Sequence, residues 1–306
     1  MIRIMVGLVL SLVATPAPAQ SCGDAPLQLQ VLGSGTATLN GGRAGPAALL
    51  WLDGKARVLI DAGPAAALRL QQAEADVADL DAILLSHLRS ERSADLPAII
   101  ALLGASARTR ALPLYGPAGN RWMPSTVTFV RTLFDPTRGA WRHLGDPLSP
   151  LARQKYRLEP HDLRLRPAKI GAPRNERAEA LAVFAGERER IRALPILAGS
   201  TPVLIWRIEA AGKSLAIAAE VASATGAVQE FVHGADLLLA APSVQEETGV
   251  DVPALARLAQ AAKVKRLVLG GAVAPTPAVD EETAALIRRH YDGPIEFATD
   301  LGCLSP

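Results

Sequence analysis

The chain has 306 residues, of which 49 % are hydrophobic and 20 % are charged. This composition excludes a disordered chain, and the length suits one large layered domain or two small ones, since single cores stop growing at roughly 250–300 residues. The net charge of +2 provides no long-range field to attract a polyanion, and only 4 % of the residues carry aromatic rings on which bases could stack. Nucleic acid is therefore not expected as a partner.

The first nineteen residues follow the plan of an export signal. Arg3 supplies a positive charge, Ile4 to Ala14 is an apolar run, and Ala17-Pro18-Ala19 offers small residues for cleavage. The apolar run is about half of the roughly 20 residues that span a bilayer, and no later stretch is long enough. We expect a signal peptide at 1–19, one domain at 20–306, no membrane span and a periplasmic or secreted protein. An uncleaved membrane anchor is the alternative.

Short strands and helices alternate along the first half of the remaining chain. Apolar alternation predicts a first strand at 27–32, and the turn signal Asp53-Gly54 predicts a hairpin. The predicted elements are strands at 47–52, 56–60, 80–86 and 112–115, with helices at 64–73 and from Asp95 to Leu103.

The second half repeats this order after an irregular stretch at 120–192. Within that stretch, the charged segment Arg174 to Arg192 is predicted to be a solvated helix. The later elements are strands at 203–208, 215–219, 237–240, 266–269 and 294–298, with helices at 225–233, 253–262 and 280–291. Two similar halves, each a sheet with helices outside, predict an α/β fold: a four-layered αββα sandwich of two facing mixed sheets.

Two cysteines remain after the signal peptide, Cys22 and Cys303. Outside the cytoplasm disulfides persist, and two thiols allow only one intrachain pairing. A disulfide between the two ends of the chain is the simplest interpretation. The alternative is two separate cysteines whose α-carbons lie too far apart to bond.

Eight short motifs follow one another in a fixed order along the chain. They are LGSGT at 32–36, LIDAG at 59–63, LDAILLSH at 80–87, DLPA at 95–98, PLYGP at 113–117, PVLIWRIEAAGKSLAI at 202–217, ADLLL at 235–239 and VKRLVL at 264–269. With these motifs the chain resembles the metallo-β-lactamase superfamily, and within it the branch of ribonuclease Z and the arylsulfatase-like hydrolases. The resemblance runs from Leu27 to Leu301.

The resemblance implies a zinc site built on a motif H-x-H-x-D-H, in which zinc activates a water molecule. Here that motif reads His87-Leu88-Arg89-Ser90-Glu91-Arg92. The first histidine is present, but arginines occupy the second and last ligand positions and Glu91 replaces the aspartate. A guanidinium has no lone pair to give to a metal, so Arg89 and Arg92 cannot coordinate zinc.

The same comparison places Ala198, Glu220 and Gly271 at three further ligand positions of the family. One histidine and two lengthened carboxylates therefore remain at the seven former metal-site positions, which are His87, Arg89, Glu91, Arg92, Ala198, Glu220 and Gly271. A catalytic zinc needs at least three protein ligands, and two fixed positive charges would lie beside this set. We expect no zinc and no other cofactor.

The two arginines allow two interpretations. Arg89 and Arg92 could pair with Asp61, Glu91 and Glu220 and fill the former metal cavity, since buried charges must be paired. Alternatively they could bind a carboxylate, sulfate or phosphate through bidentate hydrogen bonds. Asp61 itself is interpreted as a supporting residue of the turn that follows its strand.

Two functional classes remain open. The first is a non-catalytic binding or scaffold protein, with a small anionic ligand or a protein as its partner. The second is a hydrolase of esters, sulfate esters or phosphodiesters with a rebuilt or metal-free site, for which His87, Glu91 and Glu220 are the catalytic candidates. His87 would then need a positioned partner to act as a general base.

Overall fold

The structure is a computed structural model, and it describes residues 22, 25–36, 40–153, 155–164, 179–221, 226–242, 244–245, 249–271 and 277–306. The side chains of 40, 219–221, 242–250 and 277–278 are outside that description. The predicted signal peptide at 1–19 lies outside the described residues.

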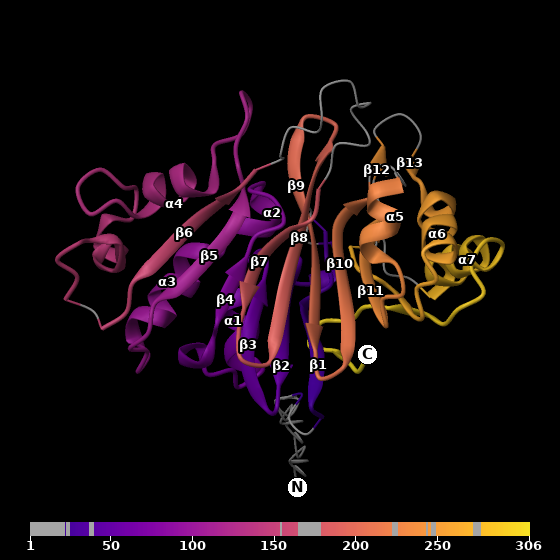
Figure 1. The fold of residues 1–306 in the computed structure, drawn as a ribbon, viewed down its shortest axis with the longest axis horizontal. Helices are drawn as coiled ribbons and strands as arrows, with labels where there is room; N and C mark the ends of the chain where they lie inside the picture. Colours follow the sequence, from indigo (N-terminus) through magenta and orange to yellow (C-terminus); the bar gives the residue numbers. More distant parts are fainter. Residues whose placement is uncertain are drawn as a thin grey trace, which may run out of the picture.

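Two mixed sheets form the centre of the molecule (Figure 1). In the first sheet the strand order is β16-β1-β2-β3-β4-β5-β6, with parallel pairing from β3 to β6 and antiparallel pairing elsewhere. Its strands are β1 (Leu27–Gly33), β2 (Ala47–Leu52), β3 (Lys55–Ile60), β4 (Ala82–Leu84), β5 (Leu112–Pro117), β6 (Leu158–Leu163) and β16 (Cys303–Leu304).

The second sheet has the order β15-β14-β11-β10-β9-β8-β7, with parallel pairing from β10 to β15 and antiparallel pairing from β7 to β10. Its strands are β7 (Leu181–Ala185), β8 (Glu189–Ala198), β9 (Thr201–Ala210), β10 (Lys213–Val221), β11 (Leu237–Pro242), β14 (Leu267–Leu269) and β15 (Ile295–Phe297). A separate ribbon joins β12 (Val244–Gln245) to β13 (Gly249–Val250).

Helices cover the outer face of each sheet. The first sheet carries α1 (Ala66–Gln72), α3 (Leu96–Ala105) and α4 (Thr126–Phe134), and the short helix α2 (Ser90–Ser93) follows β4; the second sheet carries α5 (Gly226–Val232), α6 (Val252–Ala261) and α7 (Pro277–Arg288). Figure 1 shows α3 and α4 at one flank of the molecule and α5, α6 and α7 at the other. The predicted four-layered αββα sandwich is confirmed.

Alternation along the strands divides the apolar residues among three cores. On β2, Leu49 packs under the first helical layer whereas Leu50 faces the space between the sheets. Successive strand residues point to opposite faces, so a strand covered on both sides is apolar at every position. The middle core contains the fully buried Trp206 of β9, and the third core lies under α5, α6 and α7.

The expected helix at Arg174 to Arg192 is wrong for the described part of that segment. Residues 181–185 form β7 and residues 189–198 form β8, joined by a short turn. Along β8, Glu189, Ile191 and Ala193 are buried while Arg190 and Arg192 are exposed. This period of two residues is that of a half-exposed strand, in which Arg190 and Arg192 occupy the solvent face. The irregular stretch at 120–192 also contains α4 and β6, which were not predicted.

A disulfide joins Cys22 to Cys303, with their α-carbons 5.8 Å apart. The bond lies where β16 pairs with β1, in the register that sets Gln30 opposite Cys303. The two ends of the described chain are therefore held together on the first sheet. None of the described helices is long and apolar enough to cross a membrane.

Candidate functional site

The candidate site lies where parallel strands of both sheets end. Asp61 follows β3, the segment from His87 to Arg92 follows β4, and Gly271 follows β14. Ala218 lies near the end of β10, beside the end of β11. Crevices outside the carboxyl ends of parallel strands are the usual ligand sites of α/β sheets. The topology thus brings the predicted site residues of both halves to one edge of the sandwich.

Asp61 is the most constrained residue at this edge. Its side chain is only 1 % exposed, and its backbone has a φ of 62°. Aspartate adopts this left-handed conformation more readily than most residues other than glycine. Its N–H donates to the Leu84 carbonyl at 2.7 Å, and its Oδ1 accepts from the Ser86 N–H at 2.7 Å. The carboxylate is thereby fixed between the ends of β3 and β4.

Arg92 points from α2 into the site and pairs with Asp61. Its Nη1 lies 2.6 Å from Asp61 Oδ2, and its carbonyl accepts from the Ala62 N–H at 2.8 Å. Burial raises the pKa of the Asp61 carboxyl, while the Arg92 guanidinium and the Ser86 N–H counteract that rise. A charge-assisted hydrogen bond of this length identifies a guanidinium–carboxylate pair, the kind of pairing that a buried charge requires.

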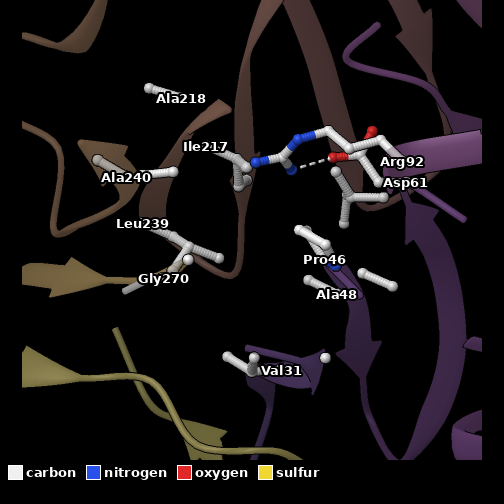
Figure 2. Close-up of a pocket in the computed structure, with 15 residues that line it drawn as sticks. Val31, Pro46, Ala48, Asp61, Arg92, Ile217, Ala218, Leu239, Ala240 and Gly270 are labelled. Carbon is white, nitrogen blue, oxygen red and sulfur yellow. Dashed lines mark hydrogen bonds and ion pairs between the residues drawn. The ribbon is translucent and has the colours of Figure 1, made fainter. Parts of the chain in front are cut away.

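A small, largely apolar cavity lies against this ion pair. Its volume is about 30 Å³, room for about one or two water molecules and too little for an organic substrate. Figure 2 shows the Arg92 guanidinium reaching from the Asp61 side of the cavity toward Ile217 of β10. Ala218 and Gly271, from the second half of the chain, also line it. The arginine therefore occupies space between the two halves.

His87 is buried as a neutral imidazole. It is 1 % exposed, and its Nδ1 accepts a hydrogen bond from the Arg89 N–H at 3.3 Å. Burial, followed by the charges of Arg92 and Arg89, lowers the pKa of His87 to about 2. An imidazole that accepts at Nδ1 carries its proton at Nε2 when neutral. A general base at neutral pH needs a pKa near that pH, and His87 is far from it.

The second arginine of the motif lies at the surface. The Arg89 side chain is 51 % exposed, and its Nε lies 2.9 Å from Oε1 of Glu91. Each arginine pairs with a carboxylate, Arg92 with Asp61 and Arg89 with Glu91. The interpretation that both arginines fill one cavity is wrong for Arg89, which does not line it. Because only Arg92 is buried in the site, the two pairs have very different surroundings.

The three downstream positions at which the resemblance predicted ligands lie in different places. Gly271 lies at the cavity with a φ of 70°, and its N–H donates to the Ser34 carbonyl at 3.0 Å. Ala198 ends β8 at the turn to β9 and is not among the residues that line the cavity. Glu220 belongs to β10, but its side chain lies outside the described residues.

These residues do not fit a zinc ion. Zinc is held by thiolates, imidazoles and carboxylates. Here the Asp61 carboxylate is engaged by Arg92 and Ser86, and the Nδ1 atom of His87 is engaged by Arg89. Among the residues whose positions are described, no three His, Cys, Asp or Glu side chains cluster to form a metal site. The donor chemistry of the described side chains at this edge is that of an ion pair.

Support from the second sheet was not foreseen from the sequence. The Leu204 N–H of β9 donates to the Ser86 carbonyl at 2.8 Å, and Trp206 Nε1 donates to Ser86 Oγ at 3.2 Å. Both bonds cross between the sheets directly before His87. In the sequence Ser86 is the last residue of a predicted strand, and no local signal connects it to Trp206, 120 positions away.

No protein-family model and no curated protein sequence matches this chain. Solved structures match over nearly its whole length. The metallo-beta-lactamase fold protein YhfI from Bacillus subtilis has a TM-score of 0.65 at 16 % identity, covering 91 % of this chain and 98 % of its own. Human tRNase Z, short form, has a TM-score of 0.63 at 19 % identity, and the match covers 91 % of this chain and 98 % of the tRNase Z chain. Zn²⁺-bound PqqB from Methylobacterium extorquens has a TM-score of 0.58 at 16 % identity, and the match covers 91 % of this chain and 100 % of the PqqB chain.

Proposed function

Since the chain has the metallo-β-lactamase fold, we propose that it is an exported, non-catalytic binding or scaffold protein in which the Arg92–Asp61 ion pair replaces the metal centre. The fold alone does not carry the activity of its neighbours, because activity lies in the site. The observation that carries the proposal is the buried Arg92 guanidinium, 2.6 Å from Asp61 at the carboxyl edge of both sheets.

The Arg92 guanidinium supplies a positive charge where metal ions would otherwise place it, and Asp61 balances that charge. A fixed guanidinium organises the surrounding carboxylate and main-chain groups without needing an ion from solution. Arg92 therefore preserves the architecture of the edge and removes its zinc chemistry. The partner we propose is a small anion or a protein, held by the loops at this edge.

A location in the periplasm or outside the cell is part of the proposal. It is supported by the disulfide between Cys22 and Cys303, because such bonds persist in oxidising compartments and are rare in the cytoplasm. The apolar run and the small-residue cleavage site at 1–19 support it from the sequence. N-terminal sequencing of the protein recovered from the periplasmic fraction and the medium tests this part: a chain recovered intact from the cytoplasm would contradict it.

A metal-free or rebuilt hydrolase is the competing function, since neighbours include a tRNase Z and a zinc-bound PqqB. Against it, the pKa of His87 is lowered to about 2, so the imidazole does not take up a proton at neutral pH. The deciding experiment combines metal analysis of the purified protein with a screen of esters, sulfate esters and phosphodiesters. We expect less than a tenth of an equivalent of zinc, iron or manganese, and no turnover above the level of the His87→Ala variant.

Two results would overturn the proposal. Stoichiometric metal that activates turnover would show that the protein is a metallohydrolase. Turnover that survives a chelator but disappears in His87→Ala would establish metal-free catalysis.

A further inference from the structure

Positive charge is concentrated on α4 and on the loop that leads from it to β6, residues 126–157, which we call the α4 flank. This segment contains six basic and two acidic residues, a net charge of +4, whereas the whole chain has a net charge of +2, so the remaining residues together carry −2. All six basic side chains are exposed: Arg131, Arg138, Arg142, Arg153, Lys155 and Arg157. The nearly neutral total therefore conceals a basic surface.

The two acids of the α4 flank bind main-chain groups. Asp135 Oδ1 accepts from the N–H groups of Thr137 and Arg138, each at 2.9 Å. The Asp146 carboxylate accepts from the Arg153 N–H at 2.9 Å. Among the described residues, none of the ion pairs includes any of the six basic side chains. Their charges therefore face solvent without a carboxylate in contact.

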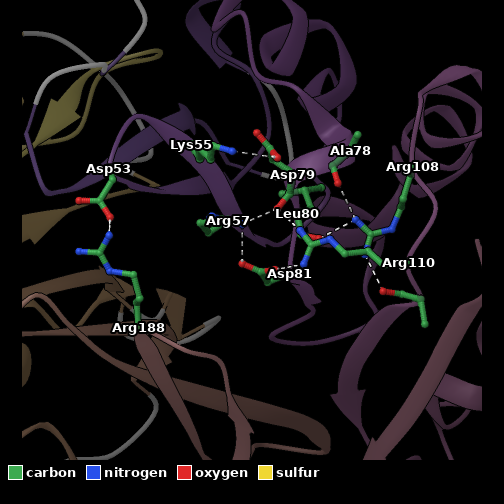
Figure 3. A network of polar contacts seen from close by, with 11 residues as sticks. Asp53, Lys55, Arg57, Ala78, Asp79, Leu80, Asp81, Arg108, Arg110 and Arg188 are labelled. Carbon is green, nitrogen blue, oxygen red and sulfur yellow. Dashed lines mark hydrogen bonds and ion pairs between the residues drawn. The ribbon is translucent and has the colours of Figure 1, made fainter.

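The arginines around the starts of β4 and β5 differ in this respect. Arg57 and Arg110 both contact Asp81, and Arg188 pairs with Asp53 of the β2–β3 turn (Figure 3). A guanidinium that is paired with a carboxylate presents little net charge to an approaching partner. The cations of the α4 flank remain available to such a partner.

Two large apolar side chains protrude from the same flank. Leu151 is 88 % exposed, the highest value among the large hydrophobic side chains whose burial is described, and Trp141 is 41 % exposed. Trp141 directly precedes Arg142, and Leu151 lies two residues before Arg153. A tryptophan beside a cation suits the interface of a membrane, because its ring is apolar and its N–H can bond to headgroups or water.

The loop that carries these side chains is fixed to the fold. The Trp141 N–H donates to the Leu133 carbonyl in the last turn of α4 at 2.7 Å. Leu144 and Leu148 pack against the core under the first helical layer. Figure 1 shows α4 at the outer flank of the first sheet, at the other end of the molecule from α5, α6 and α7. The basic and apolar groups are thus presented by one supported surface segment.

We propose that the α4 flank docks the protein on the surface of a bilayer that contains anionic phospholipids. The lipid phosphates pair with the exposed cations, and the side chains of Trp141 and Leu151 enter the boundary between headgroups and acyl chains. A protein partner fits less well, because the centre of a protein interface is depleted of charged residues. The docking surface is separate from the candidate site and does not depend on the function proposed there.

Vesicle cosedimentation of the purified disulfide-bonded protein tests the proposal. We expect binding to phosphatidylcholine vesicles that contain phosphatidylglycerol, and roughly tenfold weaker binding to vesicles of phosphatidylcholine alone. Most of the binding should be lost when the salt concentration rises from about 50 mM to about 500 mM, because salt screens exposed charges. Absence of binding to the anionic vesicles overturns the proposal. Retention on immobilised polyglutamate without binding to vesicles also overturns it and would indicate an acidic protein partner.

Neutralising the loop cations locates the contact. The triple variant Arg138→Gln, Arg142→Gln and Arg153→Gln removes three of the six basic side chains, none of which is buried. We expect its affinity for the anionic vesicles to fall by roughly tenfold or more.

A matched control removes the same charge from the opposite flank. Arg257→Gln, Arg288→Gln and Arg289→Gln alter exposed arginines of α6 and of the C-terminal end of α7. We expect this variant to lose less than about threefold in affinity, because its substitutions lie far from the docked surface. Equal losses in the two triple variants overturn the assignment to the α4 flank.

Fluorescence quenching tests the apolar contact without altering any charge. Tryptophan emission of the wild type should fall when the protein binds anionic vesicles that contain brominated phosphatidylcholine. More than about half of this decrease should disappear in Trp141→Phe, because Trp141 enters the interface. Trp122→Phe, at an exposed tryptophan outside the α4 flank, should keep the decrease. Equal quenching in the wild type and Trp141→Phe overturns the proposed docking.

Discussion

Arg92 bonds to Asp61 through its side chain and to the neighbouring Ala62 through its main chain. Arg92 Nη1 lies 2.6 Å from Asp61 Oδ2, and the Arg92 carbonyl accepts from the N–H of Ala62, the next residue after Asp61. The segment after β4 is thus fastened to the end of β3 by a side chain and a backbone bond together. This double connection makes the pair a measurable element of stability.

Removing the guanidinium should destabilise the fold strongly. Arg92→Met keeps the length of the stem but leaves the Asp61 carboxylate buried without its cation, which costs about 3–5 kcal/mol in comparable pairs. Arg89→Met, at the half-exposed arginine, should cost about 0–1 kcal/mol. Urea unfolding at pH 7 measures both. Asp61→Asn in the Arg92→Met background should recover part of the loss, since asparagine is neutral and tolerates positive φ. Equal costs for the two arginine variants would contradict the assigned role of Arg92.

Building the histidine motif that the sequence resembles should create metal binding. The triple variant Arg89→His, Glu91→Asp and Arg92→His removes two cations and adds two imidazoles beside His87, a ligand set that zinc accepts. We expect about one equivalent of zinc per triple-variant chain by metal analysis after dialysis, and far less for the wild type. His87→Ala added to the triple variant is the control and should lose the metal. Equal zinc in the wild type and the triple variant would show that the arginines do not exclude it.

His87 should make the protein sensitive to acid. Its folded pKa of about 2 lies below the ordinary 6.5, so between these values the unfolded chain binds a proton that the folded chain excludes. The contribution of the neutral His87 to the free energy of unfolding is therefore complete above pH 6.5 and is lost as the pH falls toward 2. The slope below 6.5 is about 1.4 kcal/mol per pH unit for one such group. His87→Asn should flatten it, while His143→Asn, at an exposed histidine, should leave it unchanged. An imidazole NMR titration of His87 with a midpoint near 6.5 would disprove this account.

Breaking the disulfide should weaken the whole domain. The bond between Cys22 and Cys303 closes a separation of 281 residues, and removing a native disulfide commonly costs about 2–5 kcal/mol. Urea unfolding with and without dithiothreitol measures the loss. The double variant Cys22→Ser and Cys303→Ser should match the reduced wild type and show no response to the reductant. A reductant effect on the double variant would point to a different cause.

Strands that combine an apolar run with turn residues at their ends were predictable from the sequence. The hairpin at Asp53-Gly54 and the buried parallel strands near 237–240 and 266–269 combine apolar runs with turn residues, and the structure has them within a few residues. The strands in the segment 181–198 were not recognised because four consecutive charged residues, Glu187 to Arg190, interrupt its apolar residues. Only pairing with β9 identifies Arg190 and Arg192 as the solvent face of a strand.

The site could be located from the sequence but its contacts could not. The motif from His87 to Arg92 contains two arginines that the sequence alone does not distinguish. The start of α2 separates them: Arg89 precedes the helix and turns to Glu91 at the surface, whereas Arg92 lies in the helix and enters the cavity.

The link between Cys22 and Cys303 also determines how the molecule responds to mechanical load. A force that pulls the residues before Cys22 away from the residues after Cys303 is carried by the disulfide bond. It does not load the paired strands between these two cysteines. The sheets inside the loop are shielded from that pull, including the edge that carries Arg92 and Asp61. Reduction of the bond transfers the same tension to the short pairing of β16 with β1, where Leu304 and Leu29 are opposite each other.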